Sequence, residues 1–165
     1  MSELRTNRIV PRDGLVSGAS GGVIQVVFFS LATGSTVTVN SSTFVDVLTA
    51  SITPTRSDSK ILVQVTSAPK TNGSSSNFQF GAQIQRNSTT IMYDNEYLQM
   101  NNGYAPNSMN GAYTVLDSPA STSALTYKFR VKETVDGREL YFDSSTDNTG
   151  NYYNKHTMTL MEISG

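Results

Sequence analysis

The sequence contains no cysteine, no tryptophan and a single histidine among its 165 residues. The lack of cysteine excludes disulfides, thiolate nucleophiles and cysteine-ligated zinc sites. His156 alone would have to serve any Ser–His–Asp triad, and the chain has no Gly-x-Ser-x-Gly elbow and no phosphate-binding glycine loop. Its 13 acidic residues suggest no preferred carboxylate pair. We therefore expect no enzyme, no catalytic residue and no cofactor, with His156 an ordinary strand or surface residue.

Charge is scarce as well, since 15% of the residues are charged and the net charge is −1. A nucleic-acid-binding protein would need a basic stripe, and the only basic cluster consists of Arg5, Arg8 and Arg12. No apolar run approaches the roughly 20 residues that a membrane-spanning helix needs, and no apolar signal segment follows the arginines. We expect a protein that neither binds nucleic acid nor inserts into a membrane.

What the sequence does contain favours β-structure. Ser, Thr and Asn make up 55 of the 165 residues, and runs of strong helix formers are missing. Residues 1–21 show no periodicity and end in SGASGG, a composition typical of a flexible hinge. We expect an N-terminal attachment arm over 1–21 and one β-sandwich domain over 22–165, in which short strands alternate with turns.

Three stretches alternate apolar and polar residues, which predicts strands with one buried face. The residues expected inside are Phe78, Phe80, Ala82 and Ile84; Leu125, Tyr127, Phe129 and Val131; and Ile61, Val63 and Val65. The segment 23–31 is more continuously apolar and would suit a strand buried on both faces. A further strand should end before Pro54, and Asp136-Gly137 predicts a hairpin turn.

The last segment of the chain is apolar on both of its expected faces. Met158 and Leu160 oppose Met161 and Ile163, as in a strand at the centre of a sheet or one that faces another subunit. Together these patterns predict an all-β, jelly-roll-like antiparallel β-sandwich with an extended N-terminal arm.

Two polar segments, 68–77 and 93–111, are predicted to be loops, and loops of this length are often functional. The second combines tyrosine with asparagine, which together give a large contact face and adaptable hydrogen bonds and also suit sugar rings. The candidate receptor-binding residues are Tyr93, Tyr97, Asn101, Asn102 and Tyr104, joined by Tyr152 and Tyr153 if two loops meet at one end of the sandwich. The alternative is that some of these tyrosines are core residues of strands.

A calcium site is conceivable at 143–151, where oxygen ligands come from Asp143, Asp147, Asn148 and Asn151. The spacing does not fit an EF-hand, because its sixth position is Asn148 rather than glycine and no glutamate closes the loop. A polar loop whose aspartates and asparagines cap their own turns explains the segment better. We expect no metal site.

Several segments resemble one family. They are SELRTNRIVPRDG at the start of the chain, VIQVV after the hinge, SITPTRSDSKILVQV, LDSPASTSALTYKFRV and the terminal TLMEISG. This set is similar to virion structural proteins of the tail-fibre type from tailed phages, especially marine cyanobacterial ones, and it extends over nearly the whole chain. The resemblance implies a particle component, commonly trimeric, with a β-structured domain presented outward.

We therefore expect a virion protein on the outer surface of the tail or head, most simply a homotrimeric tail fibre or fibre-tip protein that contacts a host cell-surface glycan. The alternatives are a capsid decoration or head-fibre protein without host recognition, and a carbohydrate-binding module. The arm would add a strand to a partner's sheet or line a groove, whereas a disordered terminus is the alternative. The arm residues expected to bind other virion proteins are Leu4, Arg5, Arg8, Ile9, Val10 and Arg12.

Overall fold

The computed structural model describes residues 22–32, 34–71, 78–100, 110–134, 139–143 and 156–165. Within these ranges the chain forms strands and no helix, and so contains no helix that could cross a membrane. The strands are β1 (Val23–Ser30), β2 (Thr36–Val39), β3 (Val45–Ile52), β4 (Lys60–Ser67), β5 (Lys70–Thr71), β6 (Phe78–Arg86), β7 (Thr89–Met100), β8 (Gly111–Asp117), β9 (Leu125–Glu133), β10 (Leu140–Asp143) and β11 (Thr157–Ile163).

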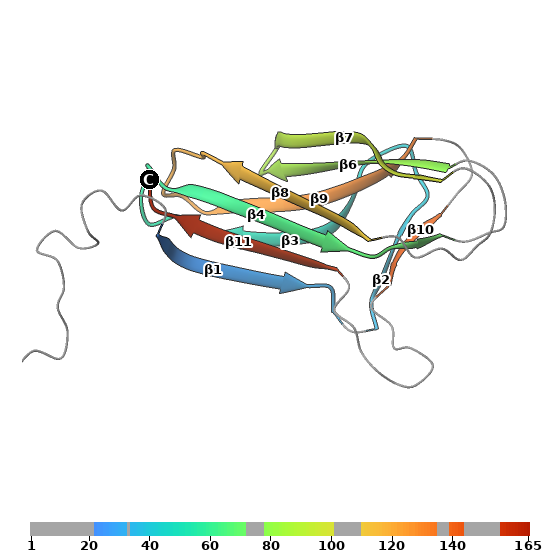
Figure 1. The fold of residues 1–165 in the computed structure, drawn as a ribbon, viewed down its shortest axis with the longest axis horizontal. Helices are drawn as coiled ribbons and strands as arrows, with labels where there is room; N and C mark the ends of the chain where they lie inside the picture. The colour runs from blue at the N-terminus through green and yellow to red at the C-terminus, as the bar shows by residue number, and fades with distance from the viewer. Residues whose placement is uncertain (1–21, 33, 72–77, 101–109, 135–138, 144–155) are drawn as a thin grey trace, which may run out of the picture.

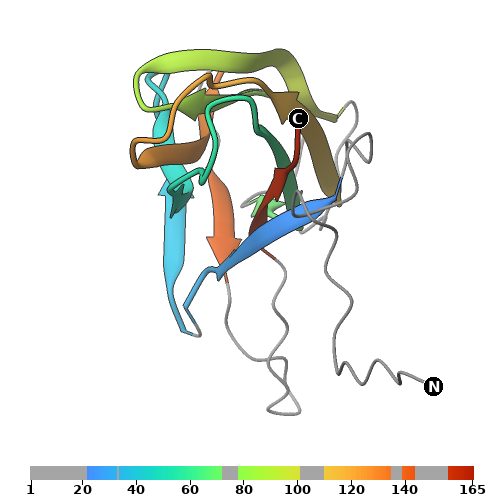
Figure 2. The same ribbon diagram turned by 90° about the vertical axis from the view of Figure 1, so that its left-hand side faces the viewer.

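Eight strands form two four-stranded antiparallel sheets, with the orders β1-β11-β4-β8 and β3-β9-β6-β7 (Figure 1). The pairing is nested: β1 pairs with β11, β3 with β9, β4 with β8 and β6 with β7. A long antiparallel hairpin that is rolled over into two facing sheets has this connectivity, which is that of a jelly roll. Figure 2 looks along the sandwich and shows the two sheets on either side of its interior. The predicted fold class is confirmed.

A third, three-stranded sheet with the order β2-β10-β5 lies at the end of the sandwich opposite the C-terminus (Figure 1). In the chain, β2 comes before β3, β10 comes after β9 and β5 comes after β4. The third sheet is therefore built from extensions of strands of both main sheets. These extensions pair with one another once they have passed the sandwich, because their backbone groups would otherwise lack partners.

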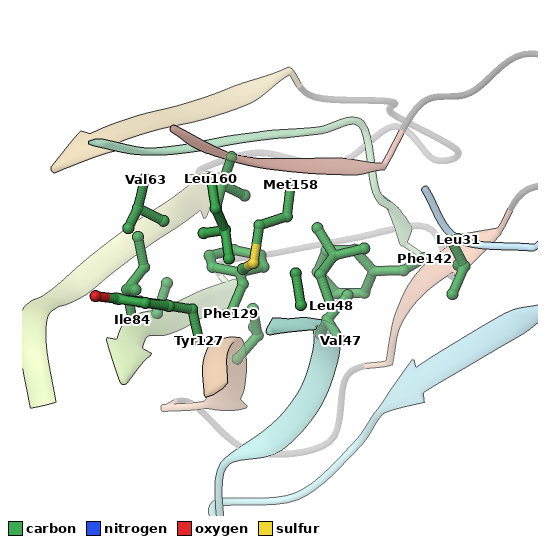
Figure 3. Close-up of a cluster of buried hydrophobic side chains, with 14 of the residues drawn as sticks. Leu31, Val47, Leu48, Val63, Ile84, Tyr127, Phe129, Phe142, Met158 and Leu160 are labelled. Atoms are coloured by element: carbon green, nitrogen blue, oxygen red, sulfur yellow. The ribbon is translucent and has the colours of Figure 1, made fainter. Parts of the chain in front are cut away.

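The core lies between the two main sheets and follows the predicted alternation. Every residue expected inside on β4, β6 and β9 is buried, apart from Phe78, whose side chain lies outside the description. Phe129 is at the centre, in edge-to-face contact with Phe142 (ring centroids 6.4 Å apart) and Tyr97 (5.6 Å). Figure 3 shows Met158 and Leu160 of β11 pointing into the same cluster, as expected for a strand at the centre of a sheet.

Three carboxylates are buried in the described part of the chain, those of Asp117, Glu133 and Glu162. Asp117 and Glu162 are each held by several donors. Asp117 on β8 accepts hydrogen bonds from Arg86 on β6 and from the Tyr127 hydroxyl on β9, each at 2.7 Å, and so joins the two sheets.

The second carboxylate belongs to Glu162 on β11. It accepts hydrogen bonds from the side-chain amide of Gln25 at 2.6 Å and from the backbone and hydroxyl of Thr55 at 2.8 and 2.9 Å. Burial by itself would raise the pKa of Glu162, but these hydrogen bonds outweigh burial and lower it. The contacts tie β1 and the segment after β3 to β11.

Two expectations about individual strands are wrong. β1 is an edge strand, and Val23, Val26 and Phe28 are more than half exposed rather than buried on both faces. β10 pairs with β2 and β5 and not with β9, so these two strands do not form a hairpin, although Asp136-Gly137 itself lies outside the described residues. A local pattern gives the apolar content of a strand but not its neighbours in the sheet.

The two predicted loops are also shorter than expected. Lys70–Thr71 form β5, and β7 runs on to Met100, so that Tyr93 and Tyr97 lie in a strand rather than in a loop. The pairing of β6 with β7 shifts between Phe80 and Ala82, because β7 carries extra residues there. This bulge disturbs the period-two pattern by which the strand would have been recognised.

Candidate functional site

The described residues contain no group of three or more His, Asp or Glu side chains that could hold a metal ion. Of the four calcium candidates, Asp143 ends β10, whereas Asp147, Asn148 and Asn151 lie outside the described residues. The expectation that this segment binds no metal therefore stays a prediction.

The single histidine is part of the fold. His156 is buried, its Nδ1 accepts a hydrogen bond from the backbone of Ala68 at 3.4 Å, and its Nε2 lies 3.2 Å from the carbonyl oxygen of Asp143. One neutral tautomer satisfies both contacts. The ring also packs edge-to-face against Phe142. This environment holds the end of β10 beside the start of β11.

Of the candidate receptor residues, the structure describes the side chains of Tyr93 and Tyr97, and it separates them. Tyr97 packs against Tyr113 and Phe129 beside the core, and its hydroxyl hydrogen-bonds with that of Ser67. Burial raises the pKa of Tyr97 to about 12. Tyr97 is therefore a packing residue, which was the alternative interpretation, whereas Tyr93 is 52% exposed.

The remaining candidates lie outside the described residues: Asn101, Asn102, Tyr104, Tyr152 and Tyr153, together with the arm residues Leu4, Arg5, Arg8, Ile9, Val10 and Arg12. The strands that follow the segments of Tyr104 and of Tyr152 and Tyr153, which are β8 and β11, belong to the same sheet. Thr66 on β4 lies between Ala112 near the start of β8 and Thr157 at the start of β11. Ala112 and Thr157 thus lie at the same end of this sheet, roughly 10 Å apart at two strand spacings.

The outer face of the β1-β11-β4-β8 sheet carries a continuous apolar row. Val26, Met161, Leu62 and Leu116 are direct partners across all four strands. Val26 and Leu116 are 55% and 54% exposed, and Phe28, one position further along the outer face of β1, is 61% exposed. Four of the five large apolar side chains that are most exposed in the described part of the chain belong to this sheet.

This face also carries little charge. By strand alternation its other side chains are almost all Ser, Thr, Gln or Ala, and Lys60 at one end is the single charged residue that the four strands place there. An isolated exposed leucine needs no explanation, but apolar residues that are aligned across a whole sheet and free of charge are typical of an interface.

The outer face of the β3-β9-β6-β7 sheet is basic by contrast. Asp46 on β3 accepts hydrogen bonds from Lys128 at 2.6 Å and from Arg130 at 2.5 Å. Burial alone would raise the pKa of Asp46, but the contacts with these two cations lower it. Arg130 further donates to the Gln85 side chain at 3.1 Å and to the Phe44 carbonyl at 3.0 Å. Both cations therefore have their partners within the sheet.

The third cation on this face has a different environment. The Lys132 ammonium lies 5.1 Å from the ring centre of Phe44 and 5.8 Å from that of Tyr93, within the range of cation–π contacts. The two rings are 6.1 Å apart and nearly perpendicular. Within the described part of the chain, Lys132 forms no ion pair. We call Phe44, Tyr93 and Lys132 the aromatic–lysine cluster.

Sequence reasoning missed the apolar row and, of the aromatic–lysine cluster, predicted only Tyr93. The apolar row comes from four strands far apart in the chain, and its one sequence signal is the apolar second face of 156–164, which suits contact with another subunit. Phe44 and Lys132 gave no signal, because Phe44 lies just before β3 and Lys132 fits the alternation of β9. Only the pairing of β3 with β9 places them side by side.

No protein family matches the sequence, and no curated protein matches it. Among solved structures, the chain is similar to one of infectious bursal disease virus, Gx strain, with 11% sequence identity and a TM-score of 0.43. That match covers 97% of this chain, which spans 42% of the other chain's length. The jelly-roll assignment rests on the strand order of the chain itself.

Proposed function

We propose that the protein is a non-catalytic structural protein of a phage virion, a trimeric fibre or fibre-tip protein of the tail. The observation that carries this proposal is the uncharged apolar row on the outer face of the β1-β11-β4-β8 sheet, which suits packing between subunits. The jelly-roll architecture and the resemblance of the sequence to tail-fibre proteins support the same role. On this proposal the arm at 1–21 binds other virion proteins.

A second copy of the same chain is the partner that this row suits best. In a trimer, each copy of this face would lie at the three-fold axis beside the same face of its two neighbours. Strongly charged faces would repel one another there, whereas this face carries only Lys60 at one end. Each half-exposed side chain of the row would contribute about 1 kcal/mol when it is buried, because full burial of such a residue contributes ~1.5–3 kcal/mol. The row would then contribute several kcal/mol for each copy.

The face is smaller than a complete subunit interface. Four strands at about 4.8 Å spacing and seven residues at about 3.4 Å rise give a face of roughly 450 Å². Stable interfaces bury about 800 Å² of each partner. The sheet would therefore form the centre of the subunit interface, and other segments of the chain would complete it. This arrangement leaves the opposite sheet, with Tyr93, free to face the host.

The oligomer is tested with Leu116→Lys, which places a charge in the exposed end of the row. Thr49→Lys on the outer face of the other sheet is the matched control, because Thr49 is exposed and gains the same charge. Light scattering coupled to size exclusion should give about 54 kDa, three times 17.9 kDa, for the wild type and for Thr49→Lys. Leu116→Lys should give the monomer mass. A wild-type monomer, or equal dissociation of both variants, would contradict the proposal.

The place on the particle is tested by immunogold electron microscopy of intact virions with antibodies raised against the folded protein. Label on the tail or its fibres is the expected result. Label spread over the head would overturn the fibre assignment in favour of a capsid decoration or head-fibre protein. Particles without any label would refute the virion role.

A further inference from the structure

The aromatic–lysine cluster differs from its surroundings because its cation has no ion-pair partner within the described residues. Lys128 and Arg130 on the same strand share the carboxylate of Asp46, at distances of 2.6 and 2.5 Å. Lys132 instead lies between two aromatic rings, which attract its charge but accept none of its three hydrogen bonds in the way a carboxylate does. Its ammonium can therefore still donate to an anion from outside.

Exposed apolar surface lies directly beside this charge. Tyr93 is the one large apolar side chain of the β3-β9-β6-β7 sheet that is more than half exposed within the described residues. Its hydroxyl donates to the Asn95 side-chain oxygen at 2.8 Å, so the amide nitrogen of Asn95 is directed to other acceptors. Gly81, the partner of Lys132 on β6, has no side chain that could separate the ammonium from β7.

We propose that this cluster binds a sugar residue that carries one anionic group, a carboxylate or a sulfate. The anionic group would accept hydrogen bonds from Lys132, the apolar face of the sugar ring would lie on Tyr93, and Asn95 would donate to a ring hydroxyl. Phe44 holds the ammonium in place from the other side. The inference rests on the proposed function, because it names the ligand class through which a fibre would contact its host.

The charge of the face argues against other anionic ligands. Nucleic acid requires several cations that follow successive phosphates, and Lys128 and Arg130 are already paired with Asp46. An acidic protein segment would also need more than one free cation. A single available cation next to an exposed ring matches a ligand with one charge per ring. Three copies in an oligomer would convert weak single contacts into useful avidity.

The test titrates the full-length protein with three oligosaccharides: a uronate tetrasaccharide, a sulfated oligosaccharide of similar length, and neutral maltotetraose. Binding is measured by saturation-transfer-difference NMR and by calorimetry. The uronate or the sulfated sugar should bind, and maltotetraose should not. Which of the two anionic sugars binds more tightly identifies the anionic group.

Variants then locate the site. Lys132→Gln and Tyr93→Ala should each weaken binding about tenfold, which corresponds to loss of one charged hydrogen bond or one stacking contact. Lys60→Gln is the matched control, because it removes the same charge from the opposite sheet and should change affinity less than about twofold. Circular dichroism should show that all three variants remain folded.

Several outcomes would overturn the inference. One is a wild-type protein that binds neither anionic sugar, and another is an equal loss of binding in Lys60→Gln and Lys132→Gln, which would indicate a general charge effect. A third is a Tyr93→Ala variant that binds as the wild type does. None of these outcomes affects the mass or the immunogold experiment. Conversely, sugar binding by a protein that is absent from the virion would refute the proposed function but would still support the sugar-binding site.

Discussion

Asp117 is the residue whose removal should most directly show how the two sheets are held together. Its carboxylate is 9% exposed, lies on β8 of one sheet, and receives the Arg86 guanidinium and the Tyr127 hydroxyl from the other. We expect Asp117→Ala to destabilise the fold far more than a substitution at an exposed position. Tyr127→Phe removes one partner and leaves the ion pair in place.

The expected loss in free energy of unfolding follows from the polar groups that each substitution leaves without a partner. Asp117→Ala leaves the fully buried Tyr127 hydroxyl without an acceptor, which costs about 1–3 kcal/mol. It also leaves the Arg86 charge unpaired, and breaking a buried ion pair costs about 3–5 kcal/mol. Because the Arg86 side chain retains 22% exposure and can still reach water, we expect a total near ~3 kcal/mol. Tyr127→Phe should cost about 1 kcal/mol.

The assay is urea denaturation at neutral pH, followed by far-UV circular dichroism at two protein concentrations so that any oligomer dissociation is separated from unfolding. The double variant Asp117→Ala/Tyr127→Phe should be no less stable than Asp117→Ala alone, because the orphaned hydroxyl is gone. A loss below about 1 kcal/mol for Asp117→Ala, or strictly additive losses in the double variant, would refute the network as a link between the sheets.

Two further predictions concern the ends of β11 and β8. The pKa of Glu162 is lowered in the folded state, so its carboxylate stabilises the fold above about pH 4.5 and this contribution is lost as the pH falls through the folded pKa. Glu162→Gln should therefore be about 2 kcal/mol less stable at neutral pH and approach the wild type in acid; a gap that stays constant in denaturation experiments from neutral to acid pH would contradict this. At Gly111, an added Cβ would lie 2.6 Å from the Tyr97 ring, which is packed against Tyr113 and Phe129. Gly111→Ala should thus cost about 1–3 kcal/mol in urea denaturation, whereas Ala112→Ser at the exposed neighbour should cost little, and equal stabilities would argue against this packing.

The sequence alone was enough for the fold class and for most of the core. The alternation on β4, β6 and β9 could be recognised because apolar core residues alternate with mostly polar residues on the opposite face. Side chains such as Phe129 and Val63 are therefore identifiable from spacing alone. The end of β3 before Pro54 could also be predicted, because proline has no backbone N–H to donate to the hydrogen bonds of a sheet.

What the sequence could not determine is which strands become neighbours. The pairing of β1 with β11 and of β3 with β9 joins residues more than 70 positions apart, and no local pattern encodes such a partner. For this reason β1 was expected to be buried, and the strand at Tyr93 and Tyr97 was obscured by its bulge.

Both candidate surfaces depend on those long-range pairings. The apolar row exists because Val26, Leu62 and Leu116 align across one sheet, and the aromatic–lysine cluster exists because β9 places Lys132 beside the strand that follows Phe44. The period of side chains along a strand is a local property that sequence reveals, whereas the register between strands is set by the packing of the whole sandwich.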